Sequence, residues 1–441
     1  MKVYLQTLGC RVNQYETDAA RELFIRNGYE IASSPEEADV CVVNTCTVTG
    51  EADRKSRQQL RKMARLNPRA VVVAMGCMSE MADGAVDADV ILGTKDKNLI
   101  VEKTEEFLRE REKSELTHRG ETTRPEVSKK DDYNEFGTVL SPEGTRAFMK
   151  IEDGCNKFCT YCIIPFARGR VASRDEENII SEAKYLASKG FREVVVSGIH
   201  ICSYGKDRGE GIEALSRVLA RIGEIEGIER IRIGSMEPMS LTPEFISDLS
   251  NIPKLCPHFH LSLQSGSATV LKRMNRDYDP GQYMEKVELL RSAFPSMSLT
   301  TDIICGFPGE TDEEFSETLK FCDRAGFTKI HVFPYSRREG TAAAKMQQLP
   351  GGLGKERAGV LGEWSDRAEE RFAEGFVGKE TSVLIESYRD DMAEGYSPEY
   401  VRSFIKMDRA VFEKLKGTIV RVRAAGASSG NIICDLILNN Y

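Results

Sequence analysis

Apolar runs of strand length alternate with amphipathic helical patterns along most of the 441-residue chain. In its N-terminal part, these strand and helix patterns follow one another as Val3–Leu8, Gln14–Asn27, Val40–Val43, Glu51–Leu66, Ala70–Met75 and Val90–Leu92. Strands that alternate with helices are joined by right-handed crossovers and form a parallel sheet. We therefore predict that residues 1–108 fold as an α/β domain around a parallel sheet.

A second alternating array begins at Ala147. Its candidate strands are Ala147–Ile151, Glu193–Ser197, Arg230–Ile233, Phe259–Leu263, Leu299–Ile304 and Lys329–Phe333. Six strand–helix units are too few for a closed eight-stranded barrel. We predict an open, partial barrel of six units that is followed by a polar helix over Lys355–Glu374, so that this second domain spans residues 147–374.

Two segments of different character flank the second array. Residues 109–146 are charged, contain Pro and Gly, and have no apolar period, which predicts a linker. Residues 375–441 carry short apolar runs at Thr381–Ile385, Val401–Ile405, Thr418–Val422 and Asn431–Leu438. Short strands of this kind predict a small all-β module at the C-terminus.

Composition argues against several classes of protein. The formal net charge is −8, from 61 Lys and Arg against 69 Asp and Glu, so bulk charge does not favour polyanion binding, although a local basic patch is compatible with it. The longest apolar runs are far shorter than the ~18–20 residues of a membrane span, and no charged-then-apolar signal segment opens the chain. Twelve cysteines are too few for a disulfide scaffold. We therefore expect a cytoplasmic protein with reduced thiols and no membrane partner.

Three cysteines lie close together in GCNKFCTYC, directly after a predicted strand. These are Cys155, Cys159 and Cys162. A structural zinc site normally has four protein ligands, and no fourth Cys or His lies nearby in the sequence. A cubane iron–sulfur cluster can be bound by three thiolates, with one iron left open to a small molecule. The alternative is that the three thiols are incidental.

Cys10, Cys46 and Cys77 form a second set, although they are far apart in the sequence. Each follows one of the predicted parallel strands of the N-terminal domain, and ligands of open α/β sheets bind at the carboxyl ends of the strands. Three neighbouring strands would each deliver one thiolate to the same edge, unless these are unrelated core cysteines. The other six show no metal-ligand spacing and are expected to be free, buried thiols: Cys41, Cys202, Cys256, Cys305, Cys322 and Cys434.

The order of these motifs resembles that of a known enzyme family. CNKFCTYC matches the CxxxCxxC signature of radical S-adenosylmethionine (SAM) enzymes, and LGCRVNQYET, NTCTV and MGC ahead of it resemble the methylthiotransferases among them. Further matching segments are IEDGCNKFCTYCIIPFARGR, HFHLSLQSGSATVLKRMNRDY, DIICGFPGETDEEF and FPYSRREGTAA. The C-terminal module is similar to the TRAM domain that such enzymes carry. The resemblance covers nearly the whole chain.

The resemblance implies two [4Fe–4S] clusters and SAM as cofactors. Cys155, Cys159 and Cys162 would hold the cluster that binds SAM and, on reduction, cleaves it to a 5′-deoxyadenosyl radical. The set of Cys10, Cys46 and Cys77 would hold an auxiliary cluster that carries the sulfur to be delivered. A low-potential electron donor such as flavodoxin or ferredoxin is implied as a partner. No side chain is assigned a catalytic role beyond the two clusters.

Contacts to SAM are expected from residues at the carboxyl ends of the second array's strands, where barrel enzymes place their sites. The candidates are Tyr161, Gly198, Ser235, Glu237, Gln264 and Ser265. For each one, turn chemistry or plain packing is the alternative. Arg168 and Arg170 follow the cysteine loop and could meet SAM or a substrate phosphate, unless they are solvated charges. His258 and His260 share one strand face, where an ordinary strand role is favoured over a metal pair.

The segment RVNQYET after Cys10 looks most like the class of the family that acts on N6-threonylcarbamoyladenosine at position 37 of tRNA. The alternatives are the isopentenyladenosine class, the class that modifies a ribosomal-protein aspartate, and a non-catalytic iron–sulfur or zinc protein that binds RNA. An anticodon loop suits the first reading, because RNA recognition favours unpaired bases that turn out of their stack. Arg421 and Arg423 share a strand face of the C-terminal module and are candidates for phosphate contacts, with a solvated face as the alternative.

Overall fold

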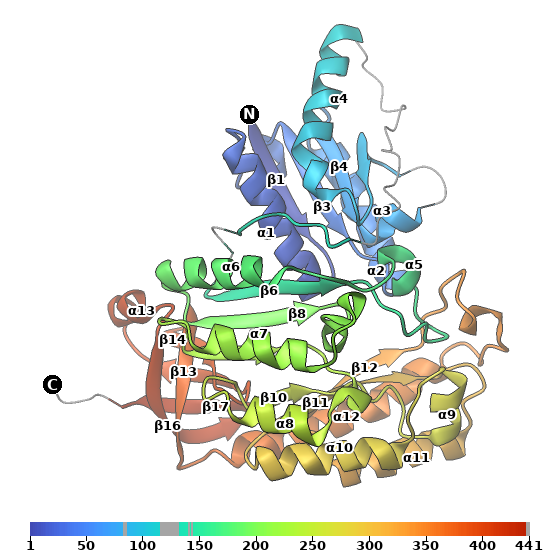
Figure 1. Cartoon of the computed structure of the whole chain (residues 1–441), viewed down its shortest axis with the longest axis vertical. Coiled ribbons are helices and arrows are strands. Elements are labelled where there is room, and N and C mark those ends of the chain that lie inside the picture. Colours follow the sequence, from blue (N-terminus) through green and yellow to red (C-terminus); the bar gives the residue numbers. More distant parts are fainter. Residues whose placement is uncertain (83–85, 115–131, 140–141, 143, 438–441) are drawn as a thin grey trace.

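The structure is a computed structural model, which describes residues 1–82, 86–114, 132–139, 142 and 144–437. The chain forms an N-terminal α/β body, a central partial barrel and a small C-terminal β-barrel, which lie side by side in Figure 1. Within the described residues, no helix combines the length and the apolar character needed to cross a membrane.

The N-terminal body is built on a parallel sheet, as predicted, with one more strand, β2, than the four predicted. Its strands are β1 (Lys2–Thr7), β2 (Glu30–Ile31), β3 (Val40–Thr45), β4 (Val71–Gly76) and β5 (Val90–Leu92), in the spatial order β2-β1-β3-β4-β5. Its helices are α1 (Arg11–Arg26), α2 (Gly50–Leu66), α3 (Cys77–Met81) and α4 (Ile100–Ser114). Strands β3 and β4 are buried along their whole length, which is typical of a parallel sheet covered by helices on both faces.

The segment predicted as a linker, residues 109–146, contains more structure than its composition suggested. Helix α4 continues to Ser114, and Phe136 and Val139 are buried against α1. Two apolar residues three apart carry no periodic signal, so the sequence pattern missed this packing. The part of the prediction that concerns residues 115–131 lies outside the described residues.

The central body contains six parallel strands in an open barrel, also as predicted. These are β6 (Arg146–Asp153), β8 (Glu193–Gly198), β9 (Arg230–Ile233), β10 (His258–His260), β11 (Ser298–Cys305) and β12 (Lys329–Pro334). A parallel bridge between Met236 and Leu261 continues the curve from β9 to β10. The short strand β7 (Ala172–Ser173) pairs antiparallel with β6 and was too short for its pattern to be recognised.

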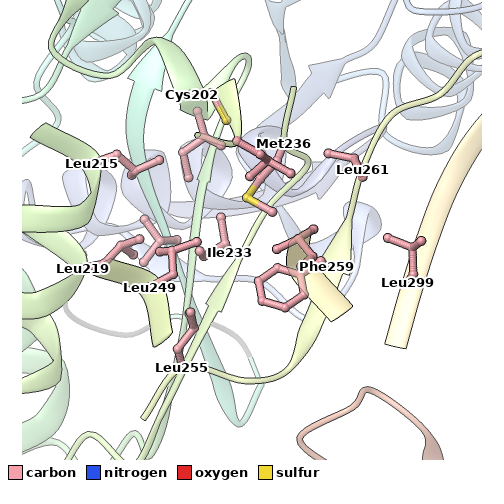
Figure 2. Close-up of a cluster of buried hydrophobic side chains, with 14 of the residues drawn as sticks. Cys202, Leu215, Leu219, Ile233, Met236, Leu249, Leu255, Phe259, Leu261 and Leu299 are labelled. Carbon is pink, nitrogen blue, oxygen red and sulfur yellow. The ribbon is translucent and has the colours of Figure 1, made fainter. Parts of the chain in front are cut away.

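Helices cover the outside of the barrel. They are α6 (Glu176–Ser188), α7 (Glu213–Gly223), α8 (Pro243–Ser250), α9 (Ala268–Arg273), α10 (Pro280–Ala293), α11 (Asp312–Ala325) and α12 (Leu353–Glu374), while α5 (Ile164–Arg168) packs against α3 of the N-terminal body. Figure 2 shows part of the core, where Leu215 and Leu219 of α7 face Ile233 of β9. Burial of such side chains contributes about 1.5–3 kcal/mol each, so this core is the main source of the barrel's stability.

The C-terminal body is a closed five-stranded barrel, consistent with the predicted TRAM-like module. Its strands and one helix are β13 (Glu380–Arg389), β14 (Met392–Tyr396), β15 (Arg402–Lys406), α13 (Arg409–Leu415), β16 (Ile419–Ser428) and β17 (Asn431–Leu436), and the strands close in the order β13-β14-β15-β17-β16. Strand β14 was not predicted, because its sequence MAEGY has no apolar run.

The segment between β14 and β15 inserts Tyr400 into the central barrel and joins all three bodies. Its hydroxyl accepts hydrogen bonds from Arg11 of α1 at 3.2 Å and from Arg146 of β6 at 2.9 Å. The Arg232 guanidinium lies 4.6 Å from the centre of the Tyr400 ring. Burial would raise the pKa of this phenol, but the charges of Arg146 and Arg11 lower it below its usual value, which indicates a strongly positive environment.

Candidate functional site

The first cysteine triad lies in the loop between β6 and α5, at the carboxyl end of β6. The backbone N–H of Cys155 donates to the Gly169 carbonyl at 3.1 Å, and that of Cys162 donates to the Cys159 carbonyl at 2.9 Å. Thr160 fixes the middle of the loop, because its hydroxyl donates to the Arg273 carbonyl at the end of α9 at 2.8 Å. The loop is therefore held by residues of the central barrel alone.

The three thiols of this triad lie near enough to influence one another electrostatically. Burial raises the pKa of the Cys155 thiol to about 11 and that of Cys162 to about 12, and the neighbouring thiol of Cys159 raises both. Backbone N–H groups of Lys157 and Ile164, each two residues further on, act in the opposite direction. N–H groups placed in this way favour thiolates, which are the form that binds iron.

The second triad is assembled at the carboxyl edge of the N-terminal sheet. Cys10, Cys46 and Cys77 follow β1, β3 and β4, which are adjacent strands. Gly9, with φ of +99°, packs so closely on Cys46 that a Cβ there would lie 2.8 Å from its Sγ. Burial, together with the neighbouring thiols of Cys77 and Cys10, raises the pKa of the Cys46 thiol to about 11.

Arg168 connects the two triads. It ends α5, six positions after Cys162, and its Nε donates to the Sγ of Cys77 at 3.2 Å. Its remaining N–H groups donate to Glu16 at 2.8 Å and to Asn13 Oδ1 at 2.8 Å, both on α1. The side chain is fully buried, so it is neither a solvated charge nor free to meet a phosphate, which corrects the expectation from sequence.

A buried network of charges holds Arg168 in place between the two bodies. Its guanidinium pairs with Asp153 at 3.0 Å, and Glu16 also pairs with Lys97 and, at 2.9 Å, with Lys150. Burial would raise the pKa of the Glu16 carboxyl, but the charges of Arg168, Lys150 and Lys97 hold it well below its usual range. Because every charge has a partner, the network is tolerated in the interior, and loss of one member would leave another unpaired.

A second arginine donates a corresponding hydrogen bond to a sulfur of the first triad. Arg276 donates from Nη1 to the Sγ of Cys159 at 3.3 Å and from Nη2 to Glu237 at 3.0 Å. Glu237 also lies 3.5 Å from His200. Burial would raise the pKa of Glu237, but His200, Arg276 and Lys157 together bring it below its usual value, so this side chain is a carboxylate.

Three buried polar atoms at and next to this carboxylate have no hydrogen bond. They are Oε1 of Glu237, Oε1 of Glu152 and Nε2 of His200. Glu152 accepts the His200 backbone N–H through its other oxygen at 2.7 Å, so the three groups lie together at the carboxyl ends of β6, β8 and β9. Buried polar groups are nearly always paired, and the unpaired oxygens of these two acidic side chains suit the ammonium group of a ligand such as SAM.

The residues predicted to contact SAM differ in their surroundings. Gly198 packs against Glu152, and a Cβ there would lie 2.6 Å from its Oε2, so a larger residue would displace the Glu152 carboxyl group. The Ser265 hydroxyl lies 3.3 Å from the Thr318 hydroxyl and accepts the Ser267 N–H, which fits turn chemistry. Tyr161 packs edge-on against Phe307 at 6.5 Å.

Two more of these candidates are defined mainly by their backbones. Gln264 has φ of +71° and bridges to β11 through its main chain, while Ser235 is exposed. The structure brings Glu237 and Gly198 to the unpaired polar atoms described above. The SAM contacts of all six residues remain predictions.

Other residues singled out from the sequence have partners of their own. His258 stacks on the Tyr400 ring at 4.9 Å, and His260 lies 3.2 Å from Asp302, so they do not share a ligand. Arg421 and Arg423 do share a face, and both donate to Glu380 at 2.8 Å. The six cysteines expected to be free thiols are all buried, as predicted.

The donor set fits an iron–sulfur cluster better than a single metal ion. Among the described residues, no three or more Cys, His, Asp or Glu side chains are grouped closely enough to hold one ion. The thiolates of a cubane bind separate irons, so they surround a larger volume than the ligands of zinc do. Each triad offers three thiols and, within the part of the chain that the structure describes, no fourth protein ligand beside them, which is consistent with this larger group.

Two residues of this site were missed in the sequence. Arg276 lies in the segment MNRDY and Glu152 in IEDGC, next to residues that were considered. No spacing rule connects Arg276 with Cys159, because the two are 117 positions apart and meet only through the packing of α9 on the cysteine loop. The signal that could have identified both residues was their position next to a recognised motif.

The fold and the cysteine loop define the class of protein as radical SAM enzymes. Residues 149–322 match the radical SAM superfamily, and residues 2–92 match an uncharacterized protein family, UPF0004. The structure is similar to that of TsrM from Kitasatospora setae, a radical S-adenosylmethionine methyltransferase, with a TM-score of 0.55, 15% identity and coverage of 75% of this chain and 72% of that one.

Comparison with curated relatives identifies the family within the class of radical SAM enzymes. The threonylcarbamoyladenosine tRNA methylthiotransferase MtaB of Aquifex aeolicus is 41% identical over 90% of this chain and 97% of its own length. The tRNA-2-methylthio-N(6)-dimethylallyladenosine synthase of Clostridium perfringens is 33% identical over 98% of this chain and 97% of its own length. The chain belongs to the radical SAM methylthiotransferase family.

Proposed function

We propose that this enzyme transfers a methylthio group to C2 of N6-threonylcarbamoyladenosine at position 37 of tRNA. One SAM serves as the methyl donor and a second as the source of the radical. The observation that carries the proposal is that the chain builds two cysteine triads and that Arg168, six positions after the first triad, donates to Cys77 of the second. The relatives of the chain include a threonylcarbamoyladenosine tRNA methylthiotransferase. The cofactors are two [4Fe–4S] clusters and SAM.

The clusters, when bound, supply the radical chemistry and the sulfur, and the protein positions and shields them. Cys155, Cys159 and Cys162 would hold the cluster that binds SAM. The triad of Cys10, Cys46 and Cys77 would hold the auxiliary cluster. Arg276 and Arg168 each place an N–H group on one cysteine sulfur, and the buried oxygens near Glu237 would receive the SAM ammonium group.

The charge around Arg11 favours the threonylcarbamoyl substrate over an isopentenyl one. Arg11 directly follows Cys10, and its guanidinium lies over the rings of Phe148 and Tyr400, at 5.9 and 5.6 Å. Arg146 and Arg232, its neighbours around Tyr400, pair with Glu386 and Glu193, but Arg11 has no carboxylate partner among the described residues. The threonyl group supplies a carboxylate, whereas the isopentenyl group is an apolar chain, so we assign Arg11 to this carboxylate.

The remaining partners follow from this chemistry. The tRNA would present adenosine 37 turned out of its stack. The C-terminal barrel, residues 375–441, would contact the RNA. The α/β domain at 1–108 and the radical SAM domain at 147–374 would form the site. A donor such as flavodoxin or ferredoxin would supply the electron, and the protein would act in the cytoplasm.

Nucleoside mass spectrometry of tRNA from cells with and without the gene tests the proposal. We expect the methylthio form of threonylcarbamoyladenosine to disappear in the deletion strain and to return with the gene. Loss of the methylthio isopentenyl form instead would keep the chemistry and overturn the substrate. An unchanged tRNA nucleoside profile would contradict tRNA as the substrate.

A further inference from the structure

Two exposed aromatic rings contact each other at the loop of the first triad and the helix that follows it. Phe158 and Phe166 are 37% and 53% exposed, and their ring centres lie 5.9 Å apart at an interplanar angle of 81°. Phe158 lies inside the cysteine loop, directly before Cys159, and Phe166 lies on α5. Large apolar side chains are normally covered, so a contacting pair left open beside a reaction site calls for a binding role.

Helix α5 carries different side chains toward the interior and the surface. Arg168, two residues after Phe166, is fully buried and reaches Cys77, whereas Phe166 is exposed and the rest of α5 is buried or half-buried. Residues two apart lie on nearly opposite sides of a helix. Phe166 therefore lies on the outer surface of the segment that follows the first triad and reaches the second.

Arg170 adds a positive charge to the aromatic pair. Its guanidinium lies 4.7 Å from the centre of the Phe158 ring, and the residue is exposed. Among the described residues it has no ion-pair partner, in a chain whose net charge is −8. An unpaired cation beside exposed aromatic rings is complementary to a nucleotide, which offers a phosphate and a flat base.

The backbone supports the exposed position of Phe158. Its φ of +49° lies in the left-handed region, which a bulky side chain rarely adopts, and the Asn275 side chain donates to its carbonyl at 3.2 Å. The loop thus turns the ring outward at a cost in backbone strain. Strain of this kind is tolerated where the residue has a function to perform.

We propose that Phe158, Phe166 and Arg170 form a stacking platform for an unpaired base next to adenosine 37 in the anticodon loop. This inference rests on the proposed function and adds how the RNA is held while its target base is turned out. When adenosine 37 turns out of the loop, it loses its stacking contact with the neighbouring base. Stacking of that neighbouring base on the platform replaces this contact. Stacking on aromatic side chains is a general mode of single-stranded RNA binding.

Fluorescence anisotropy with the reconstituted full chain tests the proposal. The probe is a labelled anticodon stem–loop RNA that carries threonylcarbamoyladenosine. We expect Phe166→Ala to weaken binding about 5- to 100-fold and Phe166→Trp to restore it. Val360→Ala, at a 46% exposed position on α12, is the matched control and is expected to leave the affinity unchanged. Iron content and melting temperature verify that each variant is folded.

Abasic versions of the RNA identify the stacked base. When the nucleotide on one side of adenosine 37 is abasic, Phe166→Ala should cause no further loss, because its partner is gone. An equal further loss with both abasic RNAs would overturn the proposal. Unchanged binding by Phe166→Ala would also overturn it, and slower reduction by flavodoxin in that variant would assign the surface to the electron donor. Failure of the unsubstituted protein to bind or modify the RNA would instead refute the proposed function itself.

Discussion

The two cysteine triads have similar surroundings, but the chain assembles them in different ways. The first lies within eight consecutive residues, and its loop is fixed by the central barrel. The second draws one residue from each of three adjacent strands, and its arginine, Arg168, comes from the neighbouring body. A local triad depends on one loop, whereas a dispersed triad depends on the correct folding of a sheet and the docking of two bodies.

Each triad nevertheless contains one arginine N–H group directed at one sulfur. Arg276 contacts Cys159 and Arg168 contacts Cys77, and each arginine is held by buried carboxylates. Hydrogen bonds to cluster sulfurs and local charge set reduction potentials. The comparison therefore predicts that each arginine influences its own cluster and leaves the other one unaffected.

The largest effect is expected from the local triad. Replacement of Cys155, Cys159 and Cys162 by alanine should reduce the iron content of the reconstituted protein from about eight to about four atoms per chain. SAM cleavage should be lost entirely, because SAM would have no cluster to bind. Iron analysis and measurement of 5′-deoxyadenosine check this, and cleavage that persists would contradict the assignment.

Arg168→Gln should destabilise the protein and its second cluster. It leaves Glu16 and Asp153 without one of their cations, which costs about 3–5 kcal/mol in the free energy of unfolding. Denaturant unfolding measures this, with Arg61→Ala, which removes an exposed ion pair with Asp87, as the control that should change little. Arg168→Lys keeps the charge but not the fork of donors, so it separates charge from hydrogen bonding.

Arg276→Gln should act on the first cluster alone. Loss of the N–H group on Cys159 should lower the reduction potential of that cluster, and activity should fall about 10- to 100-fold, as for other residues that support metal ligands. Potentiometric titration followed by electron paramagnetic resonance separates the clusters. A shift in the second cluster of similar size would mean that the two sites are not independent.

A smaller and substrate-selective effect is expected at Arg11. Arg11→Gln should lower kcat/KM for tRNA with threonylcarbamoyladenosine about tenfold, because a charge-assisted hydrogen bond to the substrate carboxylate is lost. Iron content should stay unchanged, and any activity on isopentenyladenosine tRNA should not fall. Equal losses on both RNAs would assign Arg11 to the second triad instead of the substrate.

The difference between the local and the dispersed triad also explains which features could be predicted from the sequence. Strand–helix alternation predicted both sheets, and the spacing of Cys155, Cys159 and Cys162 pointed to a cluster without any knowledge of the fold. Cys10, Cys46 and Cys77 could be grouped only because each follows a predicted strand.

The features that were missed all depend on tertiary packing. Arg168 looked like a surface charge because its partners, Glu16 and Asp153, are scattered along the sequence. Phe136 and Val139 carried no periodic signal within a charged segment, and their burial follows from the position of α1. Residues whose role is to join two bodies have no local pattern, because their partners lie in the other body.

The most direct test is product analysis with alanine in place of Cys10, Cys46 and Cys77, in reconstituted protein supplied with SAM, a reductant and tRNA. The account predicts about four irons per chain, continued production of 5′-deoxyadenosine, and no methylthio nucleoside. Formation of the methylthio nucleoside by this variant would contradict the assignment of sulfur delivery to the dispersed triad.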